Sequence, residues 1–379
     1  MKITAIHSYQ LRADLQEPFG YSQWEYKQRA TSLVEIVTDE GISGWGESFG
    51  PAAPAVSGVQ DFFAPLLIGR DPRDTEALWH FLYARSIDYG QKGVLLASIS
   101  ALDIACWDIK AQAAGVPLYR LLGGEETRSV RCYATGFYFG GSVPLEQKYA
   151  REAETYLAQG FTAAKMKVGL GIKRDVELVA AVRAALGPKC RLMIDANHAY
   201  DPHTASALAR RVERYDIYWF EEPVSPLDIE GYLAVKRATT IPIAGGECEY
   251  TRFGFEPLLR NRAVDFAQPD LCSCGGITEG LKIATLASIY NVHLTPHAWG
   301  SAIGQAAALH FYAARCRHPG SLTAEDKLIE CDQSENPFRT QIVREPIRFD
   351  RGEWLLPSSP GLGIEIDRAG LARYRVQHP

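Results

Sequence analysis

The sequence predicts a parallel α/β barrel that follows a smaller α+β domain, and three observations favour this fold class. In the last two thirds of the chain, short apolar strand candidates alternate with helical stretches at intervals of roughly 25 to 35 residues, the spacing of repeated βα units. Polar residues stand at or next to the end of nearly every strand, which a doubly wound open sheet, the competing interpretation, does not predict. The first third instead reads as a small sheet followed by helices.

The N-terminal region alternates apolar and polar residues. The segments "KITAIHSYQL" and "ATSLVEIVTDEGISGWGES" are predicted as strands, the second with a turn at Asp39 to Gly41. Helical text follows from about Asp74. The segment Gly93 to Ala114 is predicted as a helix that Gly115 and Pro117 end. Its core face carries apolar residues at helical spacing: Leu95, Ile99, Leu102, Cys106 and Ile109.

The pattern changes near Gly124, which marks the predicted domain boundary. Strand candidates then alternate with helical stretches such as "RDVELVAAVRAAL" and "GLKIATLASIYN". The tail from Arg344 to Asp367 returns to strand and loop text, and we expect it to pack on the first domain. The predicted barrel strands end near Gly136, Val168, Ala196, Glu221, Gly246, Gln268, His297 and Glu330.

The composition excludes several classes of protein. The 379 residues are 46% hydrophobic and carry a formal net charge of -5, without a basic stripe that would bind nucleic acid. Asp103 and Asp108 interrupt the most apolar segment, so no membrane span is expected. The N-terminus lacks the apolar core of a signal peptide, which favours a cytoplasmic protein. Eight cysteines without paired spacing predict reduced, mostly buried thiols.

Three predicted strands end in a carboxylate: "LMIDAN" in Asp195, "YWFEEP" in Glu221 and "IPIAGGE" in Glu247. The intervals are 221 - 195 = 26 and 247 - 221 = 26 residues, one βα unit each, so a barrel would bring the three acids to the same mouth. Three acids in one place repel each other unless a cation neutralises them. Carboxylate oxygens suit magnesium, with manganese as a substitute. The alternative is that some of these acids form structural ion pairs under the loops.

The segment "FTAAKMKVG" places Lys165 and Lys167 two residues apart in a strand, so both amines face the same side. Lysines of a solvated edge strand are the alternative. Inside a barrel mouth the two amines would approach the carbon next to a substrate carboxylate. Their mutual repulsion predicts a lowered pKa for one of them, as a base requires. Removal of the α-proton would give an enediolate whose charge the metal stabilises.

A histidine and a carboxylate follow two later strands. Asp270 and His297 are separated by 297 - 270 = 27 residues, again one unit. A carboxylate beside a histidine fixes its tautomer and raises its basicity, which suits a general acid or base. The last predicted strand brings Glu330 to the same mouth, where it could hydrogen-bond a substrate oxygen. We expect His293 and His310 to be structural.

The sequence resembles the enolase superfamily and, within it, the mandelate racemase/muconate lactonizing enzyme family. The motifs that carry the resemblance are "ALDIACWDIKAQAAGVPLYRLLGG", "KMK", "IDAN", "WFEEP", "GGE", "QPD" and "PHAWG". The resemblance implies one Mg²⁺ per subunit bound by the three strand-end acids. It further implies that Lys167 is one base with Lys165 as its partner, and that His297 with Asp270 acts on the opposite substrate face. Glu330 matches the eighth-strand glutamate of the family.

The architecture that this resemblance implies is a modified TIM barrel, (β/α)7β, at 125–344. An α+β capping domain at 1–124 would cover it, joined by the C-terminal segment 345–379. Cap loops in this family close over the substrate, and the candidates here are Glu17 to Tyr26, including Tyr21 as a substrate contact, and Phe49 to Gly58. Members of this family are often homo-oligomers, so a dimer to octamer is expected.

The lysine pair and the histidine–aspartate pair permit racemisation, dehydration or ring opening. The phrases "MIDANHAY", "FEEPVSP", "QPDLCSCGG" and "ECDQSENPFR" most resemble the branch of the family that opens sugar-acid lactones by β-elimination. Dehydration of an open-chain sugar acid is the alternative, because it needs the same base, and racemisation comes third. Asn197, His198 and Trp299 are expected to contact the substrate, although a packing role for His198 is equally open. A non-enzymatic metal-binding scaffold would explain the acids but not the lysines.

Overall fold

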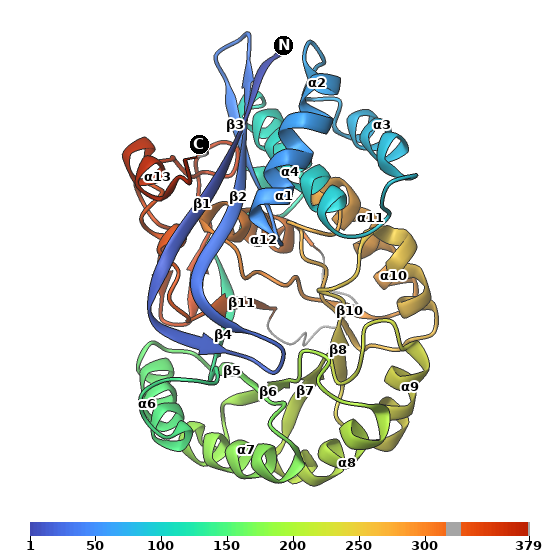
Figure 1. Cartoon of the computed structure of the whole chain (residues 1–379), viewed down its shortest axis with the longest axis vertical. Coiled ribbons are helices and arrows are strands. Elements are labelled where there is room, and N and C mark those ends of the chain that lie inside the picture. The colour runs from blue at the N-terminus through green and yellow to red at the C-terminus, as the bar shows by residue number, and fades with distance from the viewer. Residues whose placement is uncertain (316–326, 378–379) are drawn as a thin grey trace.

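The structure, a computed structural model, describes residues 1–315 and 327–377. Its N-terminal sheet consists of three antiparallel strands in the order β1 (Ile3–Gly20), β2 (Glu25–Thr38) and β3 (Ser43–Ser48). Helix α4 (Val94–Ala113) packs on this sheet (Figure 1). The packing is so close that a Cβ at Gly46 would overlap the carbonyl oxygen of Ala101, which only glycine avoids.

The remaining helices of this N-terminal region are short apart from α3. They are α1 (Ala52–Ser57), the π-helix η1 (Gly58–Phe63), α2 (Ala64–Leu67), α3 (Thr75–Ser86) and α5 (Leu118–Leu121). The buried residues of α3 and α4 form one core with the sheet, around side chains such as Trp79 and Ile99. The helix predicted for residues 93–114 differs from α4 by one residue at each end.

The second region is a parallel barrel, as the sequence predicts. Its strands follow one another around the barrel from β4 to β10, and β11 pairs with β4. The side chain of Thr295, the residue after β10, links this strand to β11: its hydroxyl donates to the Leu328 carbonyl at 2.8 Å. Within the described residues these strands are β4 (Ser129–Gly136), β5 (Ala163–Lys167), β6 (Arg191–Asp195), β7 (Ile217–Glu221), β8 (Ile243–Gly245), β9 (Phe266–Ala267), β10 (His293–Leu294) and β11 (Leu328–Asp332).

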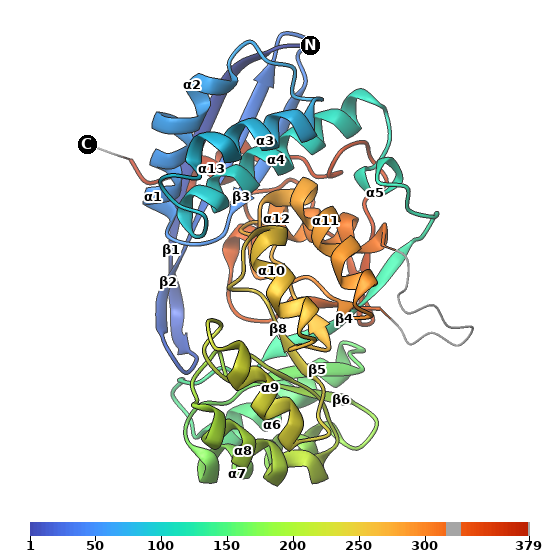
Figure 2. The ribbon, with the colours of Figure 1, turned by 90° about the vertical axis from the view of Figure 1, so that its right-hand side faces the viewer.

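Helices surround the barrel on its outside (Figures 1 and 2). The main core lies between the outer faces of the strands and these helices, at residues such as Met166, Ile194 and Phe220. None of the helices in the described ranges is long and apolar enough to cross a membrane. The outer helices are α6 (Leu145–Ala158), α7 (Ile172–Leu186), α8 (Pro202–Val212), the 3-10 turn η2 (Glu213–Tyr215), α9 (Ile229–Ala238), α10 (Thr251–Arg260), α11 (Gly276–Ile289), α12 (Ala302–Ala313) and the 3-10 turn η3 (Pro337–Arg339).

The C-terminal segment contacts both regions. The hairpin of β12 (Phe349–Asp350) and β13 (Glu353–Leu355) pairs antiparallel with the start of β4. Helix α13 (Arg368–Tyr374) then reaches the N-terminal sheet, where Arg368 forms an ion pair with Glu35. The division into segments 1–124, 125–344 and 345–379 stays a prediction.

The hairpin of β1 and β2 extends beyond its own domain. Figure 1 shows it curving down to the ends of the barrel strands. There the Gly20 amide donates to the Phe139 carbonyl at 2.9 Å, and the Ser22 hydroxyl donates to the Ala196 carbonyl at 2.6 Å. The tip of the hairpin therefore lies against the barrel mouth.

Candidate active site

The barrel interior has two layers that follow from strand periodicity. Side chains two residues apart in a strand share a face, so Lys165 stands one step above Ala163, and Glu221 one step above Trp219. The lower layer, the barrel floor, is apolar and consists of Tyr133, Ala163, Met193, Trp219, Ala244 and Leu328. The upper layer carries the charges. The floor therefore closes one end of the barrel to water and leaves the charged layer open toward the N-terminal domain.

The two lysines of β5 are buried among the predicted acids. Lys165 forms an ion pair with Glu221, and its Nζ lies 3.2 Å from Glu330 Oε1 and 3.8 Å from Asp195 Oδ2. Lys167 forms an ion pair with Asp195. Edge-strand lysines are thus excluded, because only 1% of Lys165 and 7% of Lys167 is exposed.

The predicted histidine–aspartate pair is formed. His297 Nδ1 lies 2.6 Å from Asp270 Oδ2, while the other oxygen of Asp270 accepts from the Cys272 amide at 2.6 Å. The second ring nitrogen, Nε2, points to the charged layer, 3.4 Å from Glu247 Oε2 and 3.9 Å from Glu330 Oε2. His297 stands three residues past β10 and not at a strand end as predicted, because β10 ends at Leu294.

Glu330 lies between the two halves of the site. Its carboxylate accepts hydrogen bonds from the Thr135 hydroxyl at 2.6 Å and from the Ala298 amide at 2.9 Å. Burial alone would raise the pKa of Glu330, but Lys165 and His297 outweigh burial and lower that pKa. Glu330 therefore carries a negative charge that both halves share.

The lysine pKa values correct the sequence-based expectation. Burial alone would lower both, yet Glu221 and Glu330 raise the pKa of Lys165, and Asp195 raises that of Lys167. The expectation counted the repulsion between the amines and left out the carboxylates that surround them. His297 behaves in the same way: burial would lower its pKa, but Glu247, Glu330 and Asp270 raise it to about 10.

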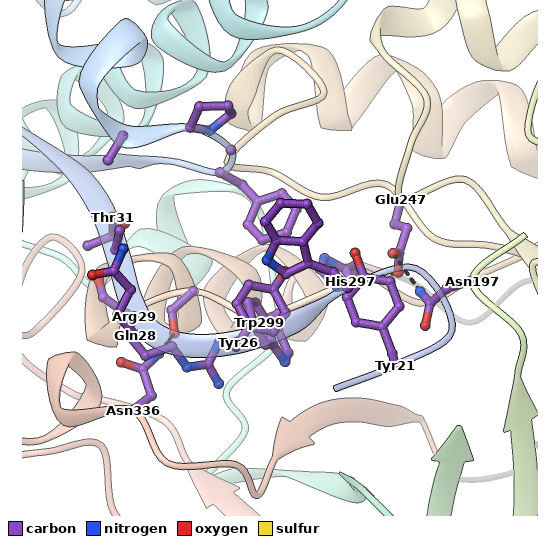
Figure 3. Close-up of a pocket in the computed structure, with 18 of the residues that line it drawn as sticks. Tyr21, Tyr26, Gln28, Arg29, Thr31, Asn197, Glu247, His297, Trp299 and Asn336 are labelled. Carbon is purple, nitrogen blue, oxygen red and sulfur yellow. Dashed lines mark hydrogen bonds and ion pairs between the residues drawn. The ribbon is translucent and has the colours of Figure 1, made fainter. Parts of the chain in front are cut away.

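A cavity of about 980 Å³ opens above the charged layer. All four predicted substrate contacts line it: Tyr21, Asn197, His198 and Trp299. Lys167, Glu247, His297 and Glu330 also reach the cavity. Figure 3 shows Tyr21, Asn197, Glu247 and His297 at one end of the cavity. Both predicted cap loops contribute to its wall, through Tyr21 and residues 23–26 of the first and residues 49–52 of the second.

A polar network that was not predicted from the sequence lies at the other end of the cavity, where Figure 3 shows Arg29 and Asn336. The Trp299 indole donates to the Tyr138 hydroxyl, which donates to Asp332, both at 2.8 Å. Arg29 binds the same carboxylate at 3.1 Å. Asp332 stands two residues after Glu330 on β11, so strand periodicity could have found it. The contact with Arg29, 303 residues away, has no local sequence signal.

The three strand-end acids suit a magnesium ion by their chemistry. Asp195 and Glu221 pair directly in the register of β6 and β7, and Glu247 stands two residues past β8. All three offer carboxylate oxygens, the ligands that magnesium prefers. In the structure each is held by a neighbour: Asp195 by Lys167, Glu221 by Lys165, and Glu247 by the Asn197 amide at 3.3 Å. Two of the three acids are thus paired with a lysine, as expected of carboxylates that can also hold a cation.

A barrel mouth that gathers acids, two lysines and a histidine–aspartate pair around one cavity defines an enzyme site for proton transfer. The chain belongs to the enolase superfamily, which confirms the resemblance and the fold class predicted from sequence. Residues 148–370 match the family described as enolase C-terminal domain-like. Residues 4–123 match the mandelate racemase/muconate lactonizing enzyme N-terminal domain.

Two curated relatives cover most of the chain. It is 44% identical to the D-galactarolactone cycloisomerase of Agrobacterium fabrum over 379 residues, 100% of both chains. It is 35% identical to the arabinonate dehydratase of Saccharolobus solfataricus, over 91% of this chain and 90% of that protein. These relatives are enzymes, so the non-enzymatic scaffold is set aside.

Solved structures give the same result. The crystal structure of the 3,6-anhydro-D-galactonate cycloisomerase from Zobellia galactanivorans matches with a TM-score of 0.90 and 44% identity, over 100% of both chains. A racemase from Streptomyces coelicolor with bound magnesium matches with a TM-score of 0.88 and 29% identity, over 99% of this chain and 100% of that one. Magnesium therefore occurs in this fold.

Proposed function

We propose that this enzyme opens a sugar-acid lactone by removing the proton next to a carboxylate and eliminating the ring carboxylate from the adjacent carbon. The observation that carries the proposal is the placement of two proton-transfer groups, Lys167 and His297, at one cavity beside the acid cluster. Their strands lie across the barrel from each other, because β5 and β10 are separated by other strands in both directions. One group can therefore address each face of a substrate between them.

The roles of the two lysines follow from their exposure. Lys167 lines the cavity, whereas Lys165 lies beneath it and is held by Glu221 and Glu330. We assign Lys167 as the group that exchanges a proton with the substrate and Lys165 as the cation that sets the charge around it. Asp270 holds His297 Nδ1, which leaves Nε2 as the atom that exchanges a proton.

One Mg²⁺ per subunit, with Mn²⁺ as a substitute, would be held by Asp195, Glu221 and Glu247. When bound, it would supply positive charge for the substrate carboxylate and for the enediolate formed from it. Lys165 holds the carboxylates of Glu221 and Glu330 in place beside this site. Asn197, whose side chain contacts both Lys167 and Glu247, would orient the carboxylate between base and acids.

The reaction conserves the atoms of the substrate. The base takes the α-proton, the C–H electron pair forms the enediolate, and the bond from the β-carbon to the ring oxygen breaks. The ring carboxylate leaves with that electron pair, and the enol product then takes a proton at the former β-carbon. A carboxylate is a weaker base than hydroxide, so ring opening demands less of the acid group than loss of water does.

The substrate class we propose is a hydroxylated carboxylate or dicarboxylate of about five or six carbons, bound as its lactone, since Asn197, His198 and Glu330 place polar groups on the cavity wall. The test is incubation with Mg²⁺ and galactarolactone, its epimers and the open acids in D₂O, followed by NMR. A 3-deoxy-2-keto product from the lactone, with deuterium at carbon 3, is the expected result. Turnover restricted to dipeptides or aromatic hydroxy acids would reject the proposal.

Dehydration of an open sugar acid is the second candidate. It is favoured by the arabinonate dehydratase at 35% identity and by D-galactonate dehydratases at 32%. The same experiment separates the two, because a dehydratase turns over only the open acids. A cytoplasmic location and a homo-oligomeric state between dimer and octamer stay part of this proposal.

A further inference from the structure

A second group of potential metal ligands lies beside the acid cluster. His198, Glu222 and Cys248 each offer one donor atom, and these three atoms lie within 4.8 Å of one another. They come from the segments that follow β6, β7 and β8, the same strands that present the predicted magnesium ligands. Chain geometry thus brings one nitrogen, one oxygen and one sulfur donor together.

This group is separate from the magnesium ligands. Glu221 is the last residue of β7, and Glu222 follows it with a positive φ of 41°, so the two carboxylates do not continue one strand face. In the same way Cys248 directly follows Glu247. The backbone fixes the arrangement, because the His198 amide donates to the Glu222 carbonyl at 2.8 Å.

Glu222 supplies an independent sign that a ligand is expected here. It is 0% exposed, and within the part of the chain that the structure describes neither carboxylate oxygen accepts a hydrogen bond of ordinary geometry; the Cys248 thiol, a member of the same group, is the polar side chain beside it. Burying a carboxylate without partners is strongly unfavourable, and structures normally supply a donor or a cation. Glu222 is itself one of the three potential ligands, so a cation bound there would neutralise its buried carboxylate.

We propose that His198, Glu222 and Cys248 bind a thiophilic divalent ion of the zinc class. Imidazole, carboxylate and thiolate are the ligands zinc takes at tetrahedral sites, whereas magnesium prefers oxygen donors alone. Three protein ligands leave a fourth position free, as in catalytic zinc sites. His198 and Cys248 line the substrate cavity, so this position is open to water or to a substrate hydroxyl.

The proposal predicts two metal sites of different preference in one subunit. Magnesium would fill the acid cluster and leave the thiol site empty, while zinc or cobalt would enter the thiol site even at saturating Mg²⁺. The inference does not rest on the proposed lactone chemistry, because it is read from metal binding and not from turnover.

The test is a titration of Co²⁺ into the Mg²⁺-saturated full chain, followed by absorption spectroscopy. We expect one equivalent of Co²⁺ to produce the thiolate-to-cobalt charge-transfer band in the near ultraviolet, and Zn²⁺ to displace it. Cys248→Ser should remove the band. Glu222→Gln, which keeps the side-chain volume, should weaken Co²⁺ binding by at least about 100-fold, the upper end of what loss of a supporting group costs.

Two variants serve as matched controls. Cys190→Ser removes a buried thiol just before β6, and His203→Ala removes an exposed imidazole from α8; both should keep the band and the affinity. Absence of the band in the unaltered protein would overturn the proposal, whatever the variants do. So would a band that persists in Cys248→Ser, or cobalt binding that Asp195→Asn abolishes and Cys248→Ser does not, since this would assign the ion to the acid cluster.

Discussion

His297 and His310 are both buried, but the barrel mouth and the helix layer shift their pKa values in opposite directions. Burial lowers the pKa of His310 to about 4 and outweighs the Leu362 carbonyl, which lies 3.0 Å from the ring and acts in the opposite direction. The Tyr119 amide donates to the other ring nitrogen at 3.2 Å, and the Tyr119 ring stacks on the imidazole. Carboxylates surround His297 and raise its pKa to about 10. Burial alone therefore does not decide whether a histidine carries charge, whereas the neighbouring charges do.

The largest effect should come from removing the ion that the mouth is built to hold. We expect a chelator to abolish turnover and Mg²⁺ to restore it, because the ion would supply the positive charge that holds the substrate carboxylate and stabilises the enediolate. Steady-state assays before and after dialysis measure this. Unchanged turnover after rigorous metal removal, or in an Asp195→Asn/Glu221→Gln double variant, would contradict it. Ca²⁺ should substitute poorly because its bonds are longer.

The next effect concerns the two proton-transfer groups of the mouth. Lys167→Ala and His297→Asn should each lower kcat by about 10²-fold to 10⁴-fold, since each removes a general acid or base. Lys173→Ala, an exposed lysine on α7, is the matched control and should keep full activity. If both active-site variants turn over an identified substrate at near-native rates, the assignment of these groups is wrong.

The helix layer should show its effect in stability at acid pH. The unfolded chain binds a proton at His310 near pH 6.5, whereas the folded chain resists it until about pH 4, so stability falls as the pH drops through this window. The lost contribution reaches about 3 kcal/mol. Urea unfolding at neutral pH and near pH 4 should show a smaller difference for His310→Gln than for the unaltered protein.

Two further results would bear on this expectation. The exposed His203→Ala variant should keep the pH dependence of the unaltered protein. If His310→Gln loses as much stability at acid pH as the unaltered protein, keeping His310 neutral in the folded state is not the cause of the acid destabilisation.

The smallest effect is a change in the titration of His297 itself. An ion bound at Glu247 would offset the first of the carboxylates that raise this pKa, so Mg²⁺ should lower it by more than about one unit. NMR of the imidazole protons against pH, with and without Mg²⁺, measures this shift. His310 is the internal control and should not respond. If Mg²⁺ leaves the pKa of His297 unchanged, the ion does not bind beside Glu247.

Sequence alone could predict the elements whose signal is local. Asp195 and Glu221 end strands where apolar text stops, and the even spacing of the acids predicts that they share one mouth. Strand periodicity also places Lys165 and Lys167 on one face. These predictions need only the period of a strand and the length of a βα unit.

The rest depends on contacts between distant segments. The pKa direction of Lys165 could not be predicted, because it depends on Glu221 and Glu330 from other strands. The link between Arg29 and Asp332 crosses domains and leaves no spacing in the sequence. Glu222 stands in the motif "WFEEP" beside a predicted ligand, and only the fold reveals that its buried carboxylate lies beside His198 and Cys248.

Because Gly46 packs closely on α4, a small tilt of the N-terminal sheet at this position would become a larger movement at the distant end of β2. Gly46 pairs with Val34 on β2, and Tyr26 at the far end of that strand is 34 - 26 = 8 residues away. At roughly 3.3 Å per residue this arm is about 26 Å long. A side chain at Gly46 that tilts the sheet by about 5° would displace Tyr26 by about 2 Å. A substitution far from the chemistry would thus move the cavity wall and weaken substrate binding while leaving every catalytic group in place.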